Sequence, residues 1–231
     1  TDGYIKTFTL KANGSISAVN SLHHENDYAA YSSLVKVDSD TYVLAYRGKN
    51  NNGFIKTFTI SSDGETITEV AKLEHDTDDA NSNSLVQADS DTYVLAYAGV
   101  DNDGYISTFT IPADGSSITE VETLEHDDNE GRYNSFIKVD ALYYALAYLG
   151  SSSDGYIKTF TISADGSSIS QKTELKHDAY SLGNGGTDNS IVQVDSDTYA
   201  LASSRKRTDG YIKTFTISSN GGITEEKSLH H

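Results

Sequence analysis

The sequence predicts an all-β fold that is built from one repeated unit of antiparallel strands. A phrase of nine residues recurs five times, at 2–10, 52–60, 103–111, 154–162 and 209–217. The pattern Leu-x-His also recurs, and it places His24, His75, His126 and His177 at intervals of 51 residues. The fold therefore follows from the periodicity of the chain, whereas the function is only weakly indicated.

Composition indicates a single soluble, β-rich domain over residues 1–231. Hydrophobic residues make up 36% of the chain, and its sixteen Tyr and seven Phe must provide much of the buried area. The formal net charge of −17 argues against nucleic acid and anionic membranes as partners, because both would be repelled. No run of about 18 apolar residues exists, so we expect no insertion into a membrane.

The N-terminus and the surface composition bear on localisation. The first residues lack the charged-then-apolar pattern of a signal peptide. Position 1 is Thr and Met is absent, so we expect a processed or truncated N-terminus. The absence of Cys excludes a disulfide scaffold and thiol chemistry. An acidic surface rich in Ser, Thr, Asn and Asp is typical of secreted proteins, and we expect the protein to be secreted or held at the cell surface.

Each unit contains two predicted hairpins. Residues 84–88 and 92–97 are short apolar runs joined by a polar Asp-Ser-Asp link, and this predicts two buried strands, the inner hairpin. Residues 53–60 alternate with period two, and a Ser-Ser-Asp-Gly turn connects them to the polar run 67–75. We name this second pair the outer hairpin. Its last strand is typical of a solvent-facing sheet edge.

Four short strands in roughly fifty residues, the most apolar first and the most polar last, resemble a blade of the β-propeller superfamily. The resemblance covers essentially the whole chain and lies in strand number and period, since the Trp-Asp signature of WD repeats and the double glycine of kelch repeats are absent. The near-identical units are similar to those of recently amplified microbial propellers. The resemblance implies that inner hairpins lie at the axis and outer hairpins at the rim.

The two kinds of hairpin differ in number. Outer hairpins begin at Gly3, Gly53, Gly104, Gly155 and Gly210. Inner hairpins begin only at Ser33, Ser84, Ser135 and Ser190. We therefore expect a half-blade over 1–31, then repeats at about 32–82, 83–133, 134–188 and 189–231, in a ring of five positions.

An isolated pair of strands is only marginally stable in water. We therefore expect the half-blade to pack beside the C-terminal blade or to borrow strands from a second chain. A fragment of a longer array remains an alternative to the five-position ring.

The repeated histidines are a first candidate site. His24, His75, His126 and His177 each lie beside an acidic residue, and His and Asp can bind metal or exchange protons. Equivalent residues of successive blades stand well apart, so at the rim they cannot share one ion. We interpret them as structural residues of the turn between blades that hydrogen-bond the neighbouring blade.

The run Asp101-Asn102-Asp103-Gly104 resembles the start of a calcium-binding loop, as found in FG-GAP-type propellers. It makes Asp101 and Asp103 candidate metal ligands. None of the corresponding loops of the other units carries both carboxylates, and a turn that uses Asp-Gly or Asn-Gly explains every copy without metal. Apart from this calcium hypothesis we expect no cofactor.

Comparison of the units shows one uniform end and one diversified end. The segments that follow each repeated His, and the loops between inner and outer hairpins, differ between units and lie at the same end, which we name the variable face. Loops on a rigid scaffold often carry binding residues, and Tyr and Arg are favoured contacts. The candidate ligand-binding residues of this face are Tyr28, Tyr31, Arg47, Arg132, Tyr133, Tyr180 and Arg205. Relaxed drift after duplication is the alternative explanation.

The sequence offers little support for catalysis, because it has no nucleophile elbow, no Cys and no phosphate-binding glycine motif. We predict a non-catalytic extracellular binding or adhesion module of a lectin-like kind, which contacts a glycan or a protein surface through the variable face. The alternative is a structural or self-assembling repeat protein without a small-molecule ligand, in which the half-blade mediates association between chains.

Overall fold

Five sheets make up the computed structural model, which describes residues 2–179, 188–205 and 209–230. The first sheet is a two-stranded half-blade of β1 (Gly3–Leu10) and β2 (Ile16–Glu25). Four antiparallel sheets of four strands follow in chain order, and we number them blades 1 to 4. Within these ranges no helix is long and apolar enough to cross a membrane.

The strands of each blade neighbour one another in sequence order. Blade 1 contains β3 (Ala30–Lys36), β4 (Thr41–Arg47), β5 (Gly53–Ile60) and β6 (Ile67–Asp76). Blade 2 contains β7 (Asn81–Gln87), β8 (Thr92–Ala98), β9 (Gly104–Thr110) and β10 (Thr119–Asp127). Blade 3 contains β11 (Arg132–Lys138), β12 (Tyr143–Gly150), β13 (Asp154–Ile162) and β14 (Ile169–Asp178). Blade 4 contains β15 (Asn189–Gln193), β16 (Thr198–Arg205), β17 (Asp209–Ile217) and β18 (Ile223–His230).

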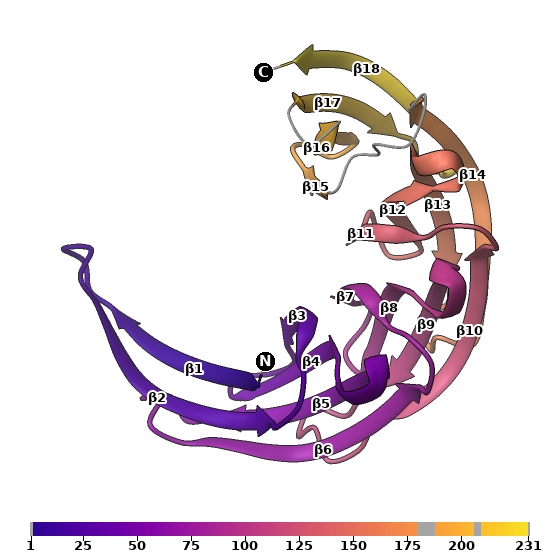
Figure 1. The fold of residues 1–231 in the computed structure, drawn as a ribbon. Helices are drawn as coiled ribbons and strands as arrows, with labels where there is room; N and C mark the ends of the chain where they lie inside the picture. Colours follow the sequence, from indigo (N-terminus) through magenta and orange to yellow (C-terminus); the bar gives the residue numbers. More distant parts are fainter. Residues whose placement is uncertain (1, 180–187, 206–208, 231) are drawn as a thin grey trace.

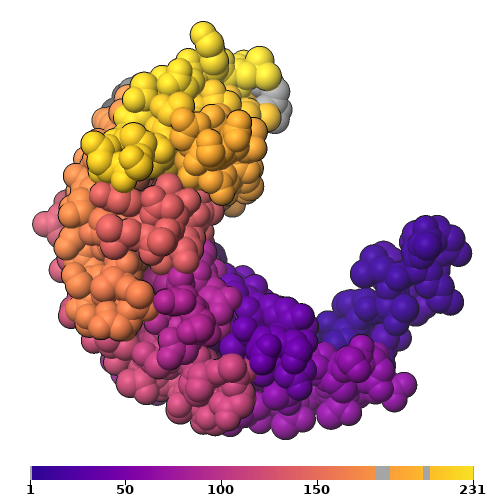
Figure 2. All heavy atoms as spheres, turned by 180° about the vertical axis from the view of Figure 1, so that it is seen from behind, coloured from indigo at the N-terminus to yellow at the C-terminus, as the bar shows by residue number. Residues whose placement is uncertain are grey.

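The sheets are arranged around an open ring (Figure 1). The first strand of each blade lines the inside of the ring and the last strand lies at its outer rim. The space-filling view shows the opening between the half-blade and blade 4 (Figure 2). The prediction of an all-β propeller with four full blades and an N-terminal half-blade is confirmed, with five sheets in successive positions of the ring.

The half-blade packs against blade 1. Ile5 and Leu22 join the apolar cluster that contains Tyr46 and Phe58 of blade 1. Ile5 is only 8% exposed, whereas Phe8, which lies on the opposite face of β1, is 51% exposed. The expectation that this pair packs beside the C-terminal blade is therefore wrong, because blade 4 lies across the opening (Figure 1).

The core consists of the apolar faces between successive blades. In blades 1 to 3 a buried Ile of the third strand shares a cluster with a buried Phe of the next blade. The pairs are Ile55 with Phe109, Ile106 with Phe160, and Ile157 with Phe215. Burial of each such side chain stabilises the fold by about 1.5–3 kcal/mol, so the aromatic residues supply much of the driving force, as the composition indicated.

A threonine latch, defined by the Oγ1 of a third-strand Thr and a glycine carbonyl of the next blade, joins the sheets. The latch bonds run from Thr7 to Gly64 (2.7 Å), from Thr57 to Gly115 (2.7 Å), from Thr108 to Gly166 (2.7 Å) and from Thr159 to Gly221 (2.6 Å). Gly115 has a φ of +66°, and a Cβ there would lie 3.1 Å from the Cβ of Thr57. Both the left-handed turn and the close approach therefore require glycine.

Short 3-10 turns connect the inner to the outer hairpins of blades 1 to 3. They are η1 (Lys49–Asn51), η2 (Val100–Asn102) and η3 (Ser151–Ser153). Their sequences differ, yet Asn50, Asp101 and Ser152 all adopt a left-handed φ, of 59°, 56° and 64°. These loops of the variable face thus differ in side chain while sharing one backbone turn.

Candidate functional site

The innermost strands begin with an irregularity near the axis. Their pairing register with the next strand shifts between Ala30 and Ser33, between Asn81 and Ser84, and between Arg132 and Ser135. One residue in each shift is left-handed, namely Tyr31 (φ 52°), Ser82 (φ 55°) and Tyr133 (φ 56°). Such residues cost on the order of 1–3 kcal/mol and tend to cluster at functional sites. The axis is therefore a candidate position for a functional site.

A cavity of about 220 Å³ opens at these residues. Each blade contributes two equivalent positions to its lining, namely Tyr31 and Ser32, Ser82 and Asn83, Tyr133 and Asn134, and Asp188 and Asn189. The first position differs between most blades, whereas the second is Asn in three of the four. We name this space the axial cavity. Its phenols, hydroxyls, amides and single carboxylate suit a small ligand with several hydroxyl groups.

Three asparagine amides fix the lining. The Nδ2 atoms of Asn83 and Asn134 each donate to the carbonyl oxygen three residues earlier, at 2.9 Å. The Nδ2 of Asn189 donates to the carbonyl of Tyr133 in the neighbouring blade, at 3.2 Å. The Oδ1 atoms of Asn83 and Asn134 are buried and have no donor among the described residues. A buried acceptor without a donor costs about 1–3 kcal/mol, so a ligand hydroxyl or a water that reached these atoms would be stabilised.

Arg47 connects the axial cavity with the outer part of the variable face. Its guanidinium carbon lies 5.7 Å from the ring centre of Tyr31 and 5.5 Å from that of Tyr28. Its Nε lies 3.5 Å from the Oδ1 of Asp79. Cation–π contacts of this kind are worth about 0.5–1 kcal/mol at exposed sites. Three residues predicted from sequence, Tyr28, Tyr31 and Arg47, therefore form one cluster.

Arg132 forms a second, similar cluster. Its guanidinium carbon lies 5.6 Å from the ring centre of Tyr133, and its Nε donates to Glu130 Oε1 at 2.8 Å. The acidic partner holds the guanidinium beside the phenol that lines the axial cavity. Arg132 and Tyr133 are thus also brought together, as predicted candidates on the variable face.

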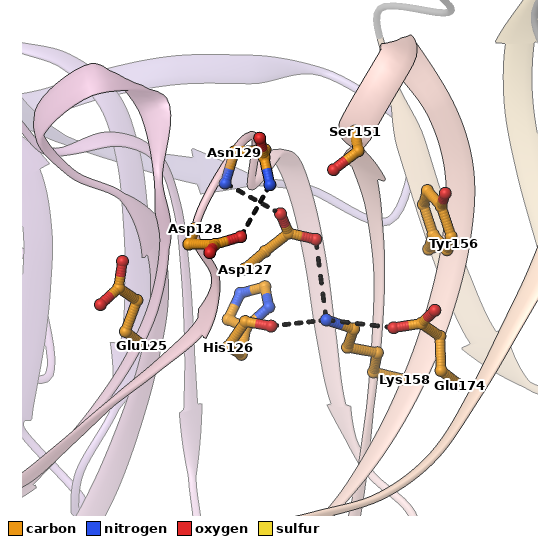
Figure 3. A pocket seen from close by; sticks show the side chains of 9 residues that line it. All are labelled: Glu125, His126, Asp127, Asp128, Asn129, Ser151, Tyr156, Lys158 and Glu174. Carbon is orange, nitrogen blue, oxygen red and sulfur yellow. Dashed lines mark hydrogen bonds and ion pairs between the residues drawn. The ribbon is translucent and has the colours of Figure 1, made fainter.

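A larger cavity of about 460 Å³ lies between blades 2 and 3 (Figure 3). It is lined by Glu125, His126, Asp127, Asp128, Asn129, Ser151, Tyr156, Lys158 and Glu174. Lys158 is the central charge of this group and is only 4% exposed. Its Nζ donates to the carbonyl of His126 at 2.5 Å and lies 3.2 Å from Glu174 Oε2 and 3.6 Å from Asp127 Oδ2.

The contact with the His126 carbonyl is a hydrogen bond, and the two carboxylates are ion-pair partners of the ammonium group. The hydroxyl of Tyr148 also donates to Asp127 Oδ2, at 2.9 Å. Burial and the charge of Asp127 raise the pKa of Tyr148 far above its usual value. The charges of Lys158, Asp127 and Glu174 are therefore paired with one another, and we interpret the cluster as a structural ion pair.

The imidazole of His126 packs beside this ion pair. Its ring lies edge-on to that of Tyr148, with the ring centres 5.0 Å apart, and both ring nitrogens lack a hydrogen-bond partner among the described residues. The ring covers Gly104, where a Cβ would lie 2.6 Å from Nε2. Burial, aided by the charge of Lys158, lowers the pKa of His126 to about 3. The imidazole is consequently neutral at physiological pH.

The same arrangement recurs at two other blade boundaries. Lys56 Nζ donates to the carbonyl of His24 at 2.5 Å, and Lys213 Nζ donates to the carbonyl of His177. The boundary between blades 1 and 2 differs, because Ser107 occupies the lysine position there. In the Lys-containing boundaries the repeated histidines thus bond the neighbouring blade through their backbone carbonyls, and not through the imidazole.

The remaining predicted site residues lie elsewhere. Asp101 is in η2 and Asp103 follows it, and partial burial together with the charge of Asp101 raises the pKa of Asp103. No group of three or more His, Cys, Asp or Glu side chains in the described ranges is placed to hold a metal ion, so no third carboxylate joins Asp101 and Asp103. Tyr180 lies outside the described residues. Arg205 is the last residue of β16.

Sequence reasoning missed six residues that line the axial cavity, namely Ser32, Ser82, Asn83, Asn134, Asp188 and Asn189. The signal for them is positional, because each stands one or two residues before the Ser that begins an inner hairpin. Polar residues in this place resemble ordinary loop residues when only one unit is considered.

No protein-family model and no curated protein sequence matches the chain. Solved structures do match. A protein from Lactobacillus plantarum superposes with a TM-score of 0.71 at 16% identity, over 99% of this chain and 64% of that one. A provisionally named 6-phosphogluconolactonase of Bacteroides fragilis gives 0.69 at 15% identity, over 98% of this chain and 64% of its own length. The periplasmic gluconolactonase PpgL of Pseudomonas aeruginosa gives 0.53 at 12%, over 97% and 78%.

The chain thus spans 64% of the length of the first two proteins. At these identities the likeness establishes the propeller fold, and Sqt1 of Saccharomyces cerevisiae shares it with a TM-score of 0.61. The prediction of a non-catalytic extracellular binding or adhesion module is contradicted, because several proteins with this fold are named as lactonases, which are enzymes. The alternative of a structural repeat without a small-molecule ligand is set aside on the same finding.

Proposed function

We propose that the axial cavity binds a sugar lactone or the corresponding sugar acid, and that the protein hydrolyses the lactone. The observation that carries this proposal is the convergence at the axis of two phenols, several amides and hydroxyls, and one carboxylate, from four blades. Phenol rings suit the faces of sugar rings, and amides and hydroxyls suit their hydroxyl groups. The names of the lactonases with this fold support the same class of ligand.

Hydrolysis of a lactone has simple requirements. A water oxygen attacks the carbonyl carbon, the ring C–O bond breaks, and the proton lost by the water is balanced by one gained at the ring oxygen. The Asp188 carboxylate is the group of the cavity lining that accepts the proton of the attacking water, as a general base. Arg132, stacked on Tyr133, attracts the carboxylate that is formed.

Hydrolysis of D-glucono-1,5-lactone, followed by pH-stat titration against the spontaneous rate, tests the proposal. Asp188→Asn is expected to lower the catalysed rate by about 100-fold, the typical contribution of a general base, while gluconate still binds. Tyr133→Ala is expected to weaken gluconate binding about tenfold, because it removes a contact face. Tyr4→Ala, which alters an exposed Tyr of the half-blade, is the matched control and should change neither quantity.

A lactone hydrolysis rate equal to the spontaneous rate, together with no gluconate binding by isothermal titration calorimetry, would overturn the proposal. Binding that survives Tyr133→Ala would place the ligand outside the axial cavity.

A further inference from the structure

Both guanidinium groups beside the tyrosines of the axial cavity are paired with an acid. Arg132 donates to Oε1 of Glu130 through its Nε, at 2.8 Å, and through its Nη2. The Nε of Arg47 lies 3.5 Å from Oδ1 of Asp79. A guanidinium binds phosphate best through two parallel N–H donors. One such pair of donors of Arg132 is therefore already occupied by a carboxylate of the chain itself.

The donors of Arg47 are occupied as well. Its Nε donates to Oδ1 of Asn51 at 3.1 Å, and its Nη2 donates to the same oxygen. Its Nη1 donates to Oδ1 of Asn81. Arg132 differs, because its Nη1 has no hydrogen bond to the described residues. The cavity therefore has one guanidinium with an edge left for a single anionic group of a ligand.

The two acids occupy the same position of the repeat, although their arginines do not. Asp79 and Glu130 each stand five residues before the Ser that begins an inner hairpin, where blade 1 has Tyr28. Arg132 follows its acid by two residues, whereas Arg47 is the last residue of β4 in the preceding blade. The charge of an arginine at the axis is thus compensated from one position, whichever element supplies the arginine.

Charge and size at the cavity disfavour a phosphate on the ligand. Among the described residues that line the cavity or contact its arginines, the carboxylates of Asp79, Glu130 and Asp188 face two guanidiniums. A phosphate monoester carries about −1.5 to −2 charges at pH 7, so this site would repel it. The volume of about 220 Å³ lies below the range of about 300–1,000 Å³ that is usual for drug-sized ligands. A single sugar ring without a phosphate meets both limits.

We propose that Asp79 and Glu130 make the axial cavity selective for unphosphorylated sugar lactones and sugar acids, because they neutralise the two arginines that would otherwise bind a phosphate. Without these acids each guanidinium would present charge-assisted donors to a phosphate. The Nη1 of Arg132 stays available for the one carboxylate of the product. This inference rests on the proposed function and names the substrate class of the same site.

Isothermal titration calorimetry with D-gluconate and 6-phospho-D-gluconate tests the selectivity through the ratio of the two dissociation constants. The wild type is expected to bind gluconate at least about tenfold more tightly than 6-phosphogluconate. Glu130→Ala frees the Nε and Nη2 donors of Arg132 and should tighten the binding of 6-phosphogluconate at least about tenfold, with gluconate binding changed by no more than about threefold. Glu130→Gln removes the charge but keeps an acceptor, so its ratio should lie between those of the wild type and Glu130→Ala.

Asp79→Asn applies the same test to Arg47. It removes the negative charge and keeps an oxygen that can accept from the N–H of Ala80, as Oδ1 of Asp79 does at 2.9 Å. The ratio should shift in the same direction, by about threefold. Asp128→Asn is the matched control, because Asp128 is an exposed acid of the loop that contains Glu130 and contacts no arginine among the described residues. Loss of its charge should leave the ratio within about twofold of the wild type.

The outcomes separate this inference from the proposed function. If the wild type binds neither acid and does not accelerate the hydrolysis of D-glucono-1,5-lactone, both are overturned. If the wild type binds 6-phosphogluconate as tightly as gluconate or more tightly, the selectivity is overturned while the proposed function stands. The same holds if Glu130→Ala and Asp79→Asn change the ratio no more than Asp128→Asn does, because the two acids would then not determine the selectivity.

Discussion

Two boundaries between blades share one aromatic contact but differ in the polar side chains beside it. They are the boundary between blades 1 and 2 and the boundary between blades 2 and 3. Both bury a histidine edge-on against a tyrosine, with ring centres 5.0 Å apart. The second places Lys158 beside Glu174, whereas the first has Ser107 and Thr123 at those places, with their hydroxyl oxygens 2.6 Å apart. Ser107 and Lys158 are both buried.

This difference shows that the fold does not require a charge between its blades. A buried ion pair must offset the cost of removing both ions from water, so it adds little net stability over a neutral pair. Once the ion pair is present, however, each buried ion needs its partner to offset the cost of its own removal from water. The two boundaries are therefore expected to respond alike to changes that affect the histidine and differently to changes that affect the ion pair.

Lowering the pH tests what the boundaries share, and it should have the largest effect. Burial lowers the pKa of His75, His126 and His177 to about 3, against about 6.5 in the unfolded chain. Between these values only the unfolded chain binds the protons, so the free energy of unfolding is highest above pH 6.5 and falls as the pH decreases. Each His lowers the free energy of unfolding by about 1.4 kcal/mol per pH unit, so the three together lower it by about 4 kcal/mol per pH unit.

Urea unfolding between pH 7 and pH 4 measures this slope. His126→Asn should reduce the slope by about one proton, and an unchanged slope in that variant would show that His126 is not buried in its neutral form. His23→Asn alters a more exposed histidine and serves as the control.

Lys158→Ala should break one boundary and leave the other intact. It removes the donor to the His126 carbonyl and leaves Asp127 with less positive charge nearby, which we expect to cost about 3 kcal/mol of unfolding free energy. Ser107→Ala removes one hydroxyl contact and should cost about 1 kcal/mol. Urea denaturation of both variants compares them. Equal losses of unfolding free energy in the two variants would contradict the view that the partners of the ion pair depend on each other and the two hydroxyl groups do not.

Introducing the ion pair into the other boundary sharpens the comparison. Ser107→Lys buries an ammonium opposite Thr123, without a carboxylate at the position of Glu174, and should lower the unfolding free energy by about 2 kcal/mol. Adding Thr123→Glu should recover at least half of this loss, because it recreates the pair seen in blade 3. Thermal unfolding of the single and double variants provides the measurement, and a double variant less stable than Ser107→Lys would be the contrary result.

Tyr148→Phe should have a smaller effect than either lysine substitution. It removes one hydrogen bond to the carboxylate of Asp127 and should cost about 1.5 kcal/mol. Tyr144→Phe in the same strand is the matched control, since its hydroxyl makes no hydrogen bond to a carboxylate among the described residues, and it should stay within about 0.5 kcal/mol of the wild type. Chemical denaturation resolves this difference, and equal losses would show that the contact with Asp127 adds no stability.

Strand positions were accessible from sequence because local alternation determines them. Residues 53–60 were predicted as a strand and form β5, and 92–97 lie within β8. The packing of the half-blade could not be predicted from the sequence, since periodicity identifies which strands pair but not where the ring opens. Tyr31 and Tyr133 were candidates because the loops around them vary, whereas Asn83 and Asp188 were missed because blades meet at the axis only in three dimensions.

Lys158 shows a different limit of sequence reasoning. A lysine in an alternating strand usually faces solvent, and only the neighbouring blade buries this one. Its acceptor, the carbonyl of His126, lies 32 residues away, and no local pattern connects the two.

The threonine latch links each sheet only to its immediate successor, and this has an evolutionary consequence. Coupling restricted to nearest neighbours makes the stability of such an array approximately a sum over units and their boundaries. Duplication or loss of one complete 51-residue segment in the gene leaves every remaining latch with both its hydroxyl donor and its glycine acceptor. The number of blades can therefore change in a single genetic step without any compensating mutation at the new junction.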